Sequence, residues 1–230
     1  MCNIRLIISD IDGTILTSNH QVDEQLIEVM PELEKANIPF VLASARSPLG
    51  MQPIAHKLGL HDNPIACYNG ALVLEGNRTI IQHPQLEGSI TGESPIIKEL
   101  QDTVSDSEPP IHKLLLIDEP EVIQDLHQKL LSMDFTQTAF YLSKDNYLEV
   151  TAKHVSKEHA LIEVAKYYDL PLEQVMTIGD NFNDSPMLAL AGLGIAMGNA
   201  PEGVKETANL VTASNDEHGV AQAIREHVLN

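Results

Sequence analysis

Uninterrupted apolar runs alternate with amphipathic stretches along most of the chain. The runs predict buried strands over residues 4–9 and 38–44 and a short strand from Pro64. The periodic pattern over 22–36 predicts a helix, and Ser47-Pro48 is typical of the start of another. This β-α-β-α order predicts a parallel sheet covered by helices on both faces.

The same alternation resumes after about residue 152. Helices are predicted over 156–168 with Ser156 as N-cap, over 184–191 and 201–207, and from Asp216 onward. Strands are predicted over 175–178, 194–197 and 209–212. Residues 71–82 are typical of a hairpin that turns at Gly76-Asn77.

The middle of the chain has a different pattern. Its apolar and polar positions predict helices over 90–104 and 120–132 and strands over 111–117, 138–143 and 146–152. This order favours a largely antiparallel α+β module. We therefore expect an α/β fold with a Rossmann-like, doubly wound parallel core, built from 1–82 and 152–230, and an inserted α+β domain at 83–151.

Composition narrows the function. The chain has 230 residues, a hydrophobic content of 43% and a formal net charge of −19 at pH 7, so nucleic acid is not an expected partner. No apolar run is long enough to span a bilayer and no signal peptide pattern begins the sequence, which favours a cytoplasmic protein without a membrane partner. Phosphate chemistry on so acidic a chain would need a local cation.

Two predicted strands end in clusters of carboxylates. "LIISDIDGT" places Asp10 and Asp12 after the first strand, and "VMTIGDNFND" places Asp180, Asn183 and Asp184 after a later one. In an open parallel sheet, ligands bind beyond the carboxyl ends of the strands. Capping explains Asp184, which precedes Ser185-Pro186, but does not explain Asp180. Two such strand ends suit Mg²⁺, which prefers oxygen ligands.

Cationic and hydroxyl side chains complete the pattern. The strand "FVLAS" ends at Ser44 with Arg46 close behind, and Lys157 begins a helix, where the helix dipole disfavours a cation. Phosphoryl transfer needs metal, cations and positioned acid–base groups together. Asp10 would then be the ionised nucleophile and metal ligand, and Asp12 would hold a proton for the leaving oxygen.

In order, "DIDGT", "SAR", Lys157 and "GDNFND" resemble the four motifs of the haloacid dehalogenase (HAD) superfamily, and specifically its Cof-type (subclass IIB) phosphatases. The resemblance extends to "YNGALV" and to "GIAMGNAPEGVKETANLVTASNDEHGVAQAI". It implies an aspartyl-phosphate on Asp10, acid–base catalysis by Asp12, and phosphoryl contacts from Ser44 and Lys157. The remaining roles that it implies are Mg²⁺ binding by Asp10, the Asp12 carbonyl and Asp180, further phosphate contacts from Asn183, orientation of Lys157 by Asp184, and a substrate mouth lined by Arg46 and Asn69.

The resemblance also implies that the inserted domain is a cap. It is short for a C2-type cap, so the sugar-phosphate preferences of larger Cof-type caps transfer poorly, and some short-cap relatives act on phosphoglycolate. Glu158 follows Lys157 where the family commonly has Gly. It either adds negative charge near the phosphate subsite or caps the helix, and we favour the cap. His154 and His159 flank Lys157 in sequence.

Three functions are consistent with these features. A Mg²⁺-dependent phosphatase of small phosphorylated metabolites, of the sugar phosphate or phosphoglycolate type, is the leading hypothesis. A phosphosugar mutase would return the phosphoryl group to an isomer instead of to water. A non-enzymatic phosphoacceptor or metabolite-binding module is the third, although it would need no leaving-group acid.

Overall fold

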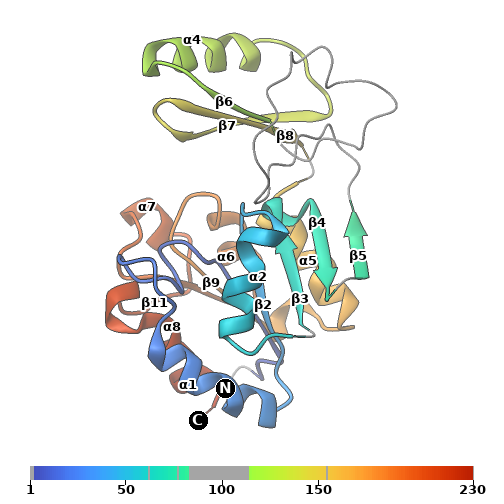
Figure 1. Ribbon diagram of the computed structural model, residues 1–230, viewed down its shortest axis with the longest axis vertical. Coiled ribbons are helices and arrows are strands. Elements are labelled where there is room, and N and C mark those ends of the chain that lie inside the picture. Colours follow the sequence, from blue (N-terminus) through green and yellow to red (C-terminus); the bar gives the residue numbers. More distant parts are fainter. Residues whose placement is uncertain (1–2, 62, 77, 83–113, 154, 230) are drawn as a thin grey trace. The chain divides into compact units, whose positions relative to one another are not determined.

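The computed structural model describes residues 3–61, 63–76, 78–82, 114–153 and 155–229. Its chain forms two compact units (Figure 1). The core unit comprises Met1–Ile81 and Ser156–Asn230, and the inserted unit comprises Gln82–Val155. Among the described residues, no helix is long and apolar enough to cross a membrane.

The described part of the core unit is built on one eight-stranded sheet in the order β11-β10-β9-β1-β2-β3-β4-β5. From β11 to β3 all neighbouring strands are parallel, and β4 runs antiparallel to β3. The strands are β1 (Leu6–Ser9), β2 (Phe40–Ala43), β3 (Pro64–Cys67), β4 (Leu72–Glu75), β5 (Arg78–Gln82), β9 (Val175–Gly179), β10 (Leu193–Ala196) and β11 (Leu210–Val211). The predicted parallel α/β core is confirmed.

Helices cover both faces of this sheet. One face packs against α1 (Glu24–Lys35), α2 (Pro48–Lys57) and α8 (Gly219–His227), and the other against α5 (Lys157–Tyr167) and α6 (Ser185–Leu190). Side chains of β1 alternate between the two layers, Ile7 toward the first and Leu6 and Ile8 toward the second, which explains why the strand is apolar throughout. Helix α7 (Glu202–Lys205) is a single turn.

Serine side chains begin two of these helices as predicted. The Ser47 hydroxyl accepts a hydrogen bond from the Gly50 amide at α2, and the Ser156 hydroxyl accepts one from the His159 amide at α5. Helix α1 begins two residues later than predicted, because the Asp23 carboxylate accepts from the Gln25 amide and so caps the helix at that point.

The predicted start of the last helix at Asp216 is wrong. Asn215–Glu217 form a 3-10 turn (η3) closed by a capping box between Ser214 and Glu217. His218 then adopts the left-handed conformation, with φ 62°, so the backbone cannot continue helically and α8 begins at Gly219.

The described part of the inserted unit is one helix on a three-stranded antiparallel sheet. Helix α4 (Pro120–Leu131) buries Ile123 against this sheet, whose strands β6 (Leu114–Ile117), β8 (Tyr147–Ala152) and β7 (Thr138–Lys144) lie in that order. Phe135 and Phe140 contact edge to face. The predicted helix over 90–104 and the start of the strand predicted over 111–117 lie outside the described residues.

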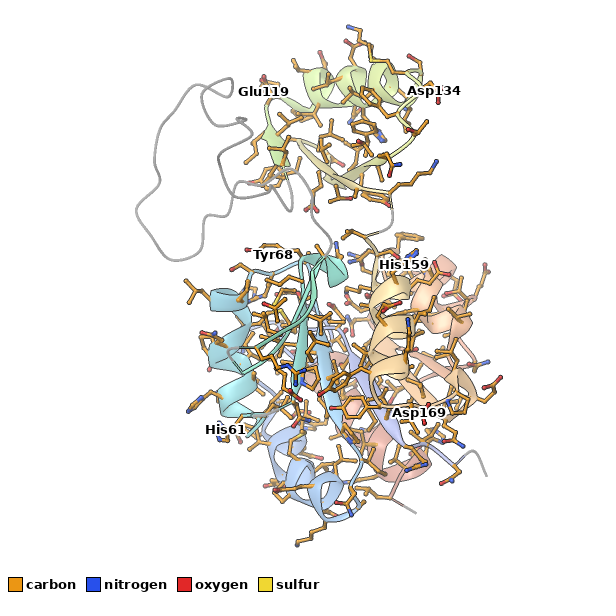
Figure 2. The ribbon with its side chains drawn as sticks, turned by 90° about the vertical axis from the view of Figure 1, so that its right-hand side faces the viewer. His61, Tyr68, Glu119, Asp134, His159 and Asp169 are labelled. Atoms are coloured by element: carbon orange, nitrogen blue, oxygen red, sulfur yellow. The ribbon has the colours of Figure 1, made fainter. Side chains whose placement is uncertain are left out.

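The two ends of the core unit differ in the chain segments they present (Figure 2). Tyr68, which follows β3, and His159, in the first turn of α5, lie at one end of the unit, whereas His61 and Asp169 lie at the opposite end. The first end therefore combines the carboxyl ends of the parallel strands with the amino end of α5. It is where the predicted site residues follow their strands.

Candidate active site

Four neighbouring strands deliver the predicted site residues to one edge of the sheet. Asp180 follows β9, Asp10 follows β1, Ser44 follows β2 and Asn69 follows β3 within two residues. These strands are adjacent and parallel in the order β9-β1-β2-β3, so their carboxyl ends meet. The geometry that the sequence predicted for this edge is therefore present.

Lys157 brings a buried ammonium group to this edge from the first position of α5. Its Nζ donates hydrogen bonds to Asp10 Oδ1, at 2.5 Å, and to Asp184 Oδ1. The Lys157 side chain is only 1% exposed. Burial lowers the pKa of Lys157, but the charges of Asp10 and Asp184 outweigh it and hold the pKa above its usual value. Lys157 is therefore a fixed positive charge between two carboxylates.

Asp184 uses both carboxylate oxygens to hold the site together. Oδ1 accepts from Lys157, and Oδ2 accepts from the backbone amides of Asp180 and Asn181, each at 3.0 Å. The predicted N-cap role is wrong for the side chain, which makes no capping bond to α6 although Asp184 occupies the N-cap position. The Asp184 carboxylate therefore links Lys157 to the loop that carries Asp180.

Asp10 and Asp180 are carboxylates in a crowded, largely buried environment. Burial raises the pKa of Asp10 to about 8, against the opposing charge of Lys157. Burial also raises the pKa of Asp180, as does the nearby charge of Asp184. The Thr14 hydroxyl donates to Asp180 Oδ1 at 3.1 Å. Removal from water and the negative charge of Asp184 both disfavour the ionised forms of these two acids.

The three acids at this edge fit a divalent cation. One oxygen each from Asp10, Asp180 and Asp184 lies within 4.8 Å of the others. When all three carboxylates are ionised, their negative charge exceeds the single positive charge of Lys157 by two, and a bound cation would offset that excess. Oxygen ligands and an excess of negative charge suit a hard divalent cation. Because Asp184 already binds Lys157 and two amides, Asp10 and Asp180 are the two acids open to an ion.

Asp12 is held by Arg46 in a two-pronged ion pair. Arg46 Nη2 donates to Asp12 Oδ1 at 2.6 Å, and Nε donates to Oδ2 at 2.7 Å. The hydrogen bond to Asp12 raises the pKa of Arg46 above its usual value. The sequence predicted Arg46 only as a substrate-lining residue, and the structure shows it bound to the other carboxylate of the DxD motif. Both Asp12 oxygens act as acceptors in this arrangement.

Ser44 and Asn69 lie on the two segments that follow β2 and β3, and backbone hydrogen bonds join these segments to each other. The buried Ser44 hydroxyl accepts a hydrogen bond from the backbone N–H of Arg46 at 3.3 Å. The backbone N–H of Asn69 donates to the Ser44 carbonyl at 2.8 Å. Tyr68, Asn69 and Gly70 have φ angles of 52°, 56° and 95°. Left-handed backbone at two successive non-glycine residues is uncommon, and such residues cluster at functional sites. Among the described residues, buried Asn69 Oδ1 has no hydrogen-bond partner.

The remaining predicted residues lie around this centre. Asn183 is exposed, and its side chain has no hydrogen-bond partner within the part of the chain that the structure describes. Glu158 lies in the first turn of α5, where Ser156 provides the cap. His159 Nδ1 lies 3.0 Å from the Ser156 hydroxyl, and His154 lies outside the described residues.

Two residues to which the sequence assigned no role contact the loops that follow β9 and β1. Thr14 binds Asp180, and Asn199 Nδ2 donates to the carbonyl of Gly13 at 2.9 Å. Thr14 is part of the quoted "DIDGT" motif, so that motif already contained the first signal. Asn199 lies in the "GIAMGNA" stretch, but its partner is 186 positions away, and no local pattern indicates that contact.

Comparisons with known proteins agree with this geometry. The sequence matches the model of the haloacid dehalogenase-like hydrolases over residues 7–93 and 87–224. A Haemophilus influenzae protein that is provisionally named a phosphatase is 32% identical to this chain, and the match covers 96% of this chain and 97% of that protein. The 5-amino-6-(5-phospho-D-ribitylamino)uracil phosphatase YcsE of Bacillus subtilis is 29% identical over 99% of this chain and 97% of its own.

A solved structure shows the same similarity in three dimensions. A haloacid dehalogenase-like hydrolase from Bacteroides thetaiotaomicron superposes with a TM-score of 0.84 at 25% identity. The match covers 97% of this chain and 99% of that one. The motifs, the fold and the family match therefore agree, and the chain belongs to the haloacid dehalogenase-like hydrolases.

Proposed function

We propose that the protein is a Mg²⁺-dependent phosphatase that hydrolyses small phosphate monoesters through a phosphorylated Asp10. The observation that carries this proposal is the buried contact of Lys157 with Asp10 and Asp184, beside Asp180 at the carboxyl ends of the strands. A dianionic phosphoryl group needs a nucleophile, fixed positive charge and a cation site in one place. All three can be assigned to residues at this edge.

Asp10 is the proposed nucleophile. A carboxylate oxygen of Asp10 would attack phosphorus and form an acyl phosphate while the bond from phosphorus to the ester oxygen breaks. Lys157 and the Ser44 hydroxyl would hold phosphoryl oxygens, and Asn183 would add a contact from the exposed side of the loop. Mg²⁺, held by Asp10, Asp180 and the Asp12 carbonyl, would stabilise the negative charge on the phosphoryl oxygens and keep Asp10 ionised.

Asp12 is the proposed acid and base. It would give a proton to the departing ester oxygen, and would then accept a proton from the water that cleaves the acyl phosphate and restores Asp10. Because Arg46 now occupies both Asp12 oxygens, Asp12 has to leave this ion pair before it can carry a proton. A substrate phosphate that binds Arg46 would release Asp12 at the moment when the acid is needed.

The proposed substrates are small phosphorylated metabolites of the sugar phosphate or phosphoglycolate type. The name of the Bacillus subtilis relative states a substrate with a phosphorylated ribityl chain, which is a polyol phosphate. The inserted unit would act as the cap that selects among such esters. An isomerised ester in place of free phosphate would identify a mutase instead.

The first test is phosphate release from a panel of sugar phosphates, phosphoglycolate and nucleotides, with and without Mg²⁺. We expect release that requires Mg²⁺ and falls by at least about 10³-fold in Asp10→Asn, because the amide cannot form the acyl phosphate. Asp169→Asn is the matched control. Asp169 is a left-handed residue at the opposite end of the core unit, where asparagine is well tolerated. Absence of release across the panel would overturn the proposal.

A further inference from the structure

Gly13 is the residue whose backbone is least restricted by its own side chain in the loop over residues 10–14 after β1, which we call the acidic loop. It lies between Asp12 and Thr14 and has a φ of +77°. A Cβ atom on Gly13 would lie 2.3 Å from Asp180 Oδ2, so a side chain is excluded there. Glycine adopts left-handed and right-handed conformations with similar ease, so nothing in Gly13 itself selects the orientation of its peptide groups.

The side chain of Asn199 fixes that orientation from outside the loop. Its Nδ2 donates to the Gly13 carbonyl at 2.9 Å, and its Oδ1 accepts from the Asn215 amide at 3.0 Å. A carbonyl can only accept and an amide N–H can only donate, so only one orientation of the Asn199 side-chain amide satisfies both partners. Asn199 thus connects the segment after β10 and the segment before α8 to the acidic loop.

We propose that Asn199 is a positioning residue that selects the active orientation of the Gly13 peptide, and thereby the placement of Asp12 and Thr14. The inference rests on the proposed phosphatase function. Thr14 donates a hydrogen bond to Asp180, and Asp12 is the proposed acid. Rotation of the Gly13 peptide would therefore displace both the Thr14 hydroxyl and the Asp12 carboxyl group. Asn199 touches neither group and acts only through the Gly13 carbonyl.

Two neighbouring hydrogen bonds hold the same stretch of chain without reaching the acidic loop. Asn215 Nδ2 donates to the Leu16 carbonyl at 2.8 Å, and the Ser18 amide donates to Asp216 Oδ1 at 2.8 Å. The Asn215 side chain therefore provides a matched control. Asn215→Ala removes a side-chain amide bond of the same kind, to the Leu16 carbonyl three residues beyond Gly13, and leaves the Asn215 N–H in place for Asn199.

The kinetic test compares Asn199→Ala, Asn199→Asp and Asn215→Ala. One partly exposed hydrogen bond changes a conformational population by up to about tenfold. We therefore expect kcat to fall about three- to tenfold in Asn199→Ala with little change in KM, because Ser44 and Lys157 are untouched. Asn199→Asp keeps the acceptor for Asn215 but faces Gly13 with a second acceptor, so it should lose at least as much. Asn215→Ala should keep its kcat.

A second measurement tests the orientation of the Gly13–Thr14 peptide directly, in the metal-free protein and without substrate. The Thr14 amide donates to the Ile11 carbonyl at 3.4 Å, and this bond is lost if the Gly13–Thr14 peptide turns. Amide exchange followed by ¹H–¹⁵N NMR should therefore be faster at Thr14 in Asn199→Ala and unchanged in Asn215→Ala. Equal exchange at Thr14 in the wild type, Asn199→Ala and Asn215→Ala would overturn the inference. An equal loss of kcat in the two alanine variants would also overturn it. If the wild type releases no phosphate, the proposed function fails, and the exchange rates alone decide whether Asn199 positions Gly13.

Discussion

Buried charge defines the chemistry of this protein at its individual residues. The Lys157 side chain is 1% exposed and the Asp184 side chain is fully buried. Lys157 Nζ and both Asp184 carboxylate oxygens nevertheless have hydrogen-bond partners. Breaking a buried ion pair by removing one partner costs about 3–5 kcal/mol, which is far more than an exposed pair such as Lys129–Asp125 contributes. Removal of either partner of the Lys157–Asp184 pair should therefore lower stability as well as disturb the proposed site.

The raised pKa of Asp10 predicts how the stability of the metal-free protein depends on pH. Its folded pKa is about 8 and its unfolded value about 3.8, so between these values the folded protein keeps a proton that the unfolded chain releases. The free energy of unfolding should therefore fall as the pH rises from about 5 to 8, by up to about 1.4 kcal/mol per pH unit. Urea unfolding in EDTA measures this slope.

Asp10→Asn is the control for that slope. The amide does not titrate, so the variant should lose most of the dependence while Asp180, whose pKa is also raised by burial, retains a smaller part with the same sign. A wild-type stability that increases with pH across this window would contradict the assignment of a neutral Asp10 in the metal-free protein.

Asp12 should reveal its role through the leaving group. Asp12→Asn should lower kcat/KM for an alkyl phosphate by about 10²–10⁴-fold, because the alkoxide leaves only with a proton. With p-nitrophenyl phosphate the loss should be much smaller, since that phenolate leaves without one. Steady-state kinetics on both esters, with Asp169→Asn as the control, test this difference. An equal loss on the two esters would show that Asp12 is not the acid.

Strands and helices followed from the sequence wherever one pattern was uninterrupted. Runs such as "LIIS" and "FVLA" are buried on both faces, so their positions and the meeting of their carboxyl ends could be predicted. The start of α8 could not, because the left-handed His218 follows from a local capping box that competes with a helix. The Asp12–Arg46 pair was also missed, since a long side chain reaches many partners and the sequence does not select among them.

Two glycines with positive φ angles, Gly70 in the turn after β3 and Gly76 after β4, should differ in how well they tolerate a side chain. Gly70 has a φ of +95°, and a Cβ there would lie 2.7 Å from the Ala160 Cβ of α5. Gly76 in the β4–β5 hairpin has a φ of +56° and open space around it. Gly76→Ala should cost about 1 kcal/mol of unfolding free energy from backbone strain alone. Gly70→Ala should cost about 2–4 kcal/mol, because α5 must also move.

Urea unfolding of both glycine variants measures this difference, and phosphatase assays add a second comparison. Gly70→Ala should also lower kcat, since α5 carries Lys157, whereas Gly76→Ala should keep its kcat. Equal destabilisation of the two variants would mean that the Tyr68–Gly70 turn is not packed tightly against α5.

The net charge of the protein governs how a phosphorylated substrate approaches it. A formal charge of −19 repels a dianion over the roughly 30 Å Debye length that applies at about 0.01 M salt. At about 0.5 M salt this repulsion is largely screened, whereas the buried Lys157 is screened much less. We therefore expect kcat/KM to rise several-fold with NaCl at fixed free Mg²⁺, with kcat nearly constant. A fall with salt would show that local cations, and not the net charge, control the encounter.

The interrupted order of the core unit sets when the protein can first work during its synthesis. Strand β1 leaves the ribosome early but pairs on one side with β9 (Val175–Gly179), and Asp10 waits for Lys157, which is 147 positions later. Until then one edge of β1 has no neighbour and remains open to unwanted pairing. A chain that stops before α5 lacks Lys157, Asp180 and Asp184, so the proposed hydrolysis cannot begin on an unfinished or truncated product.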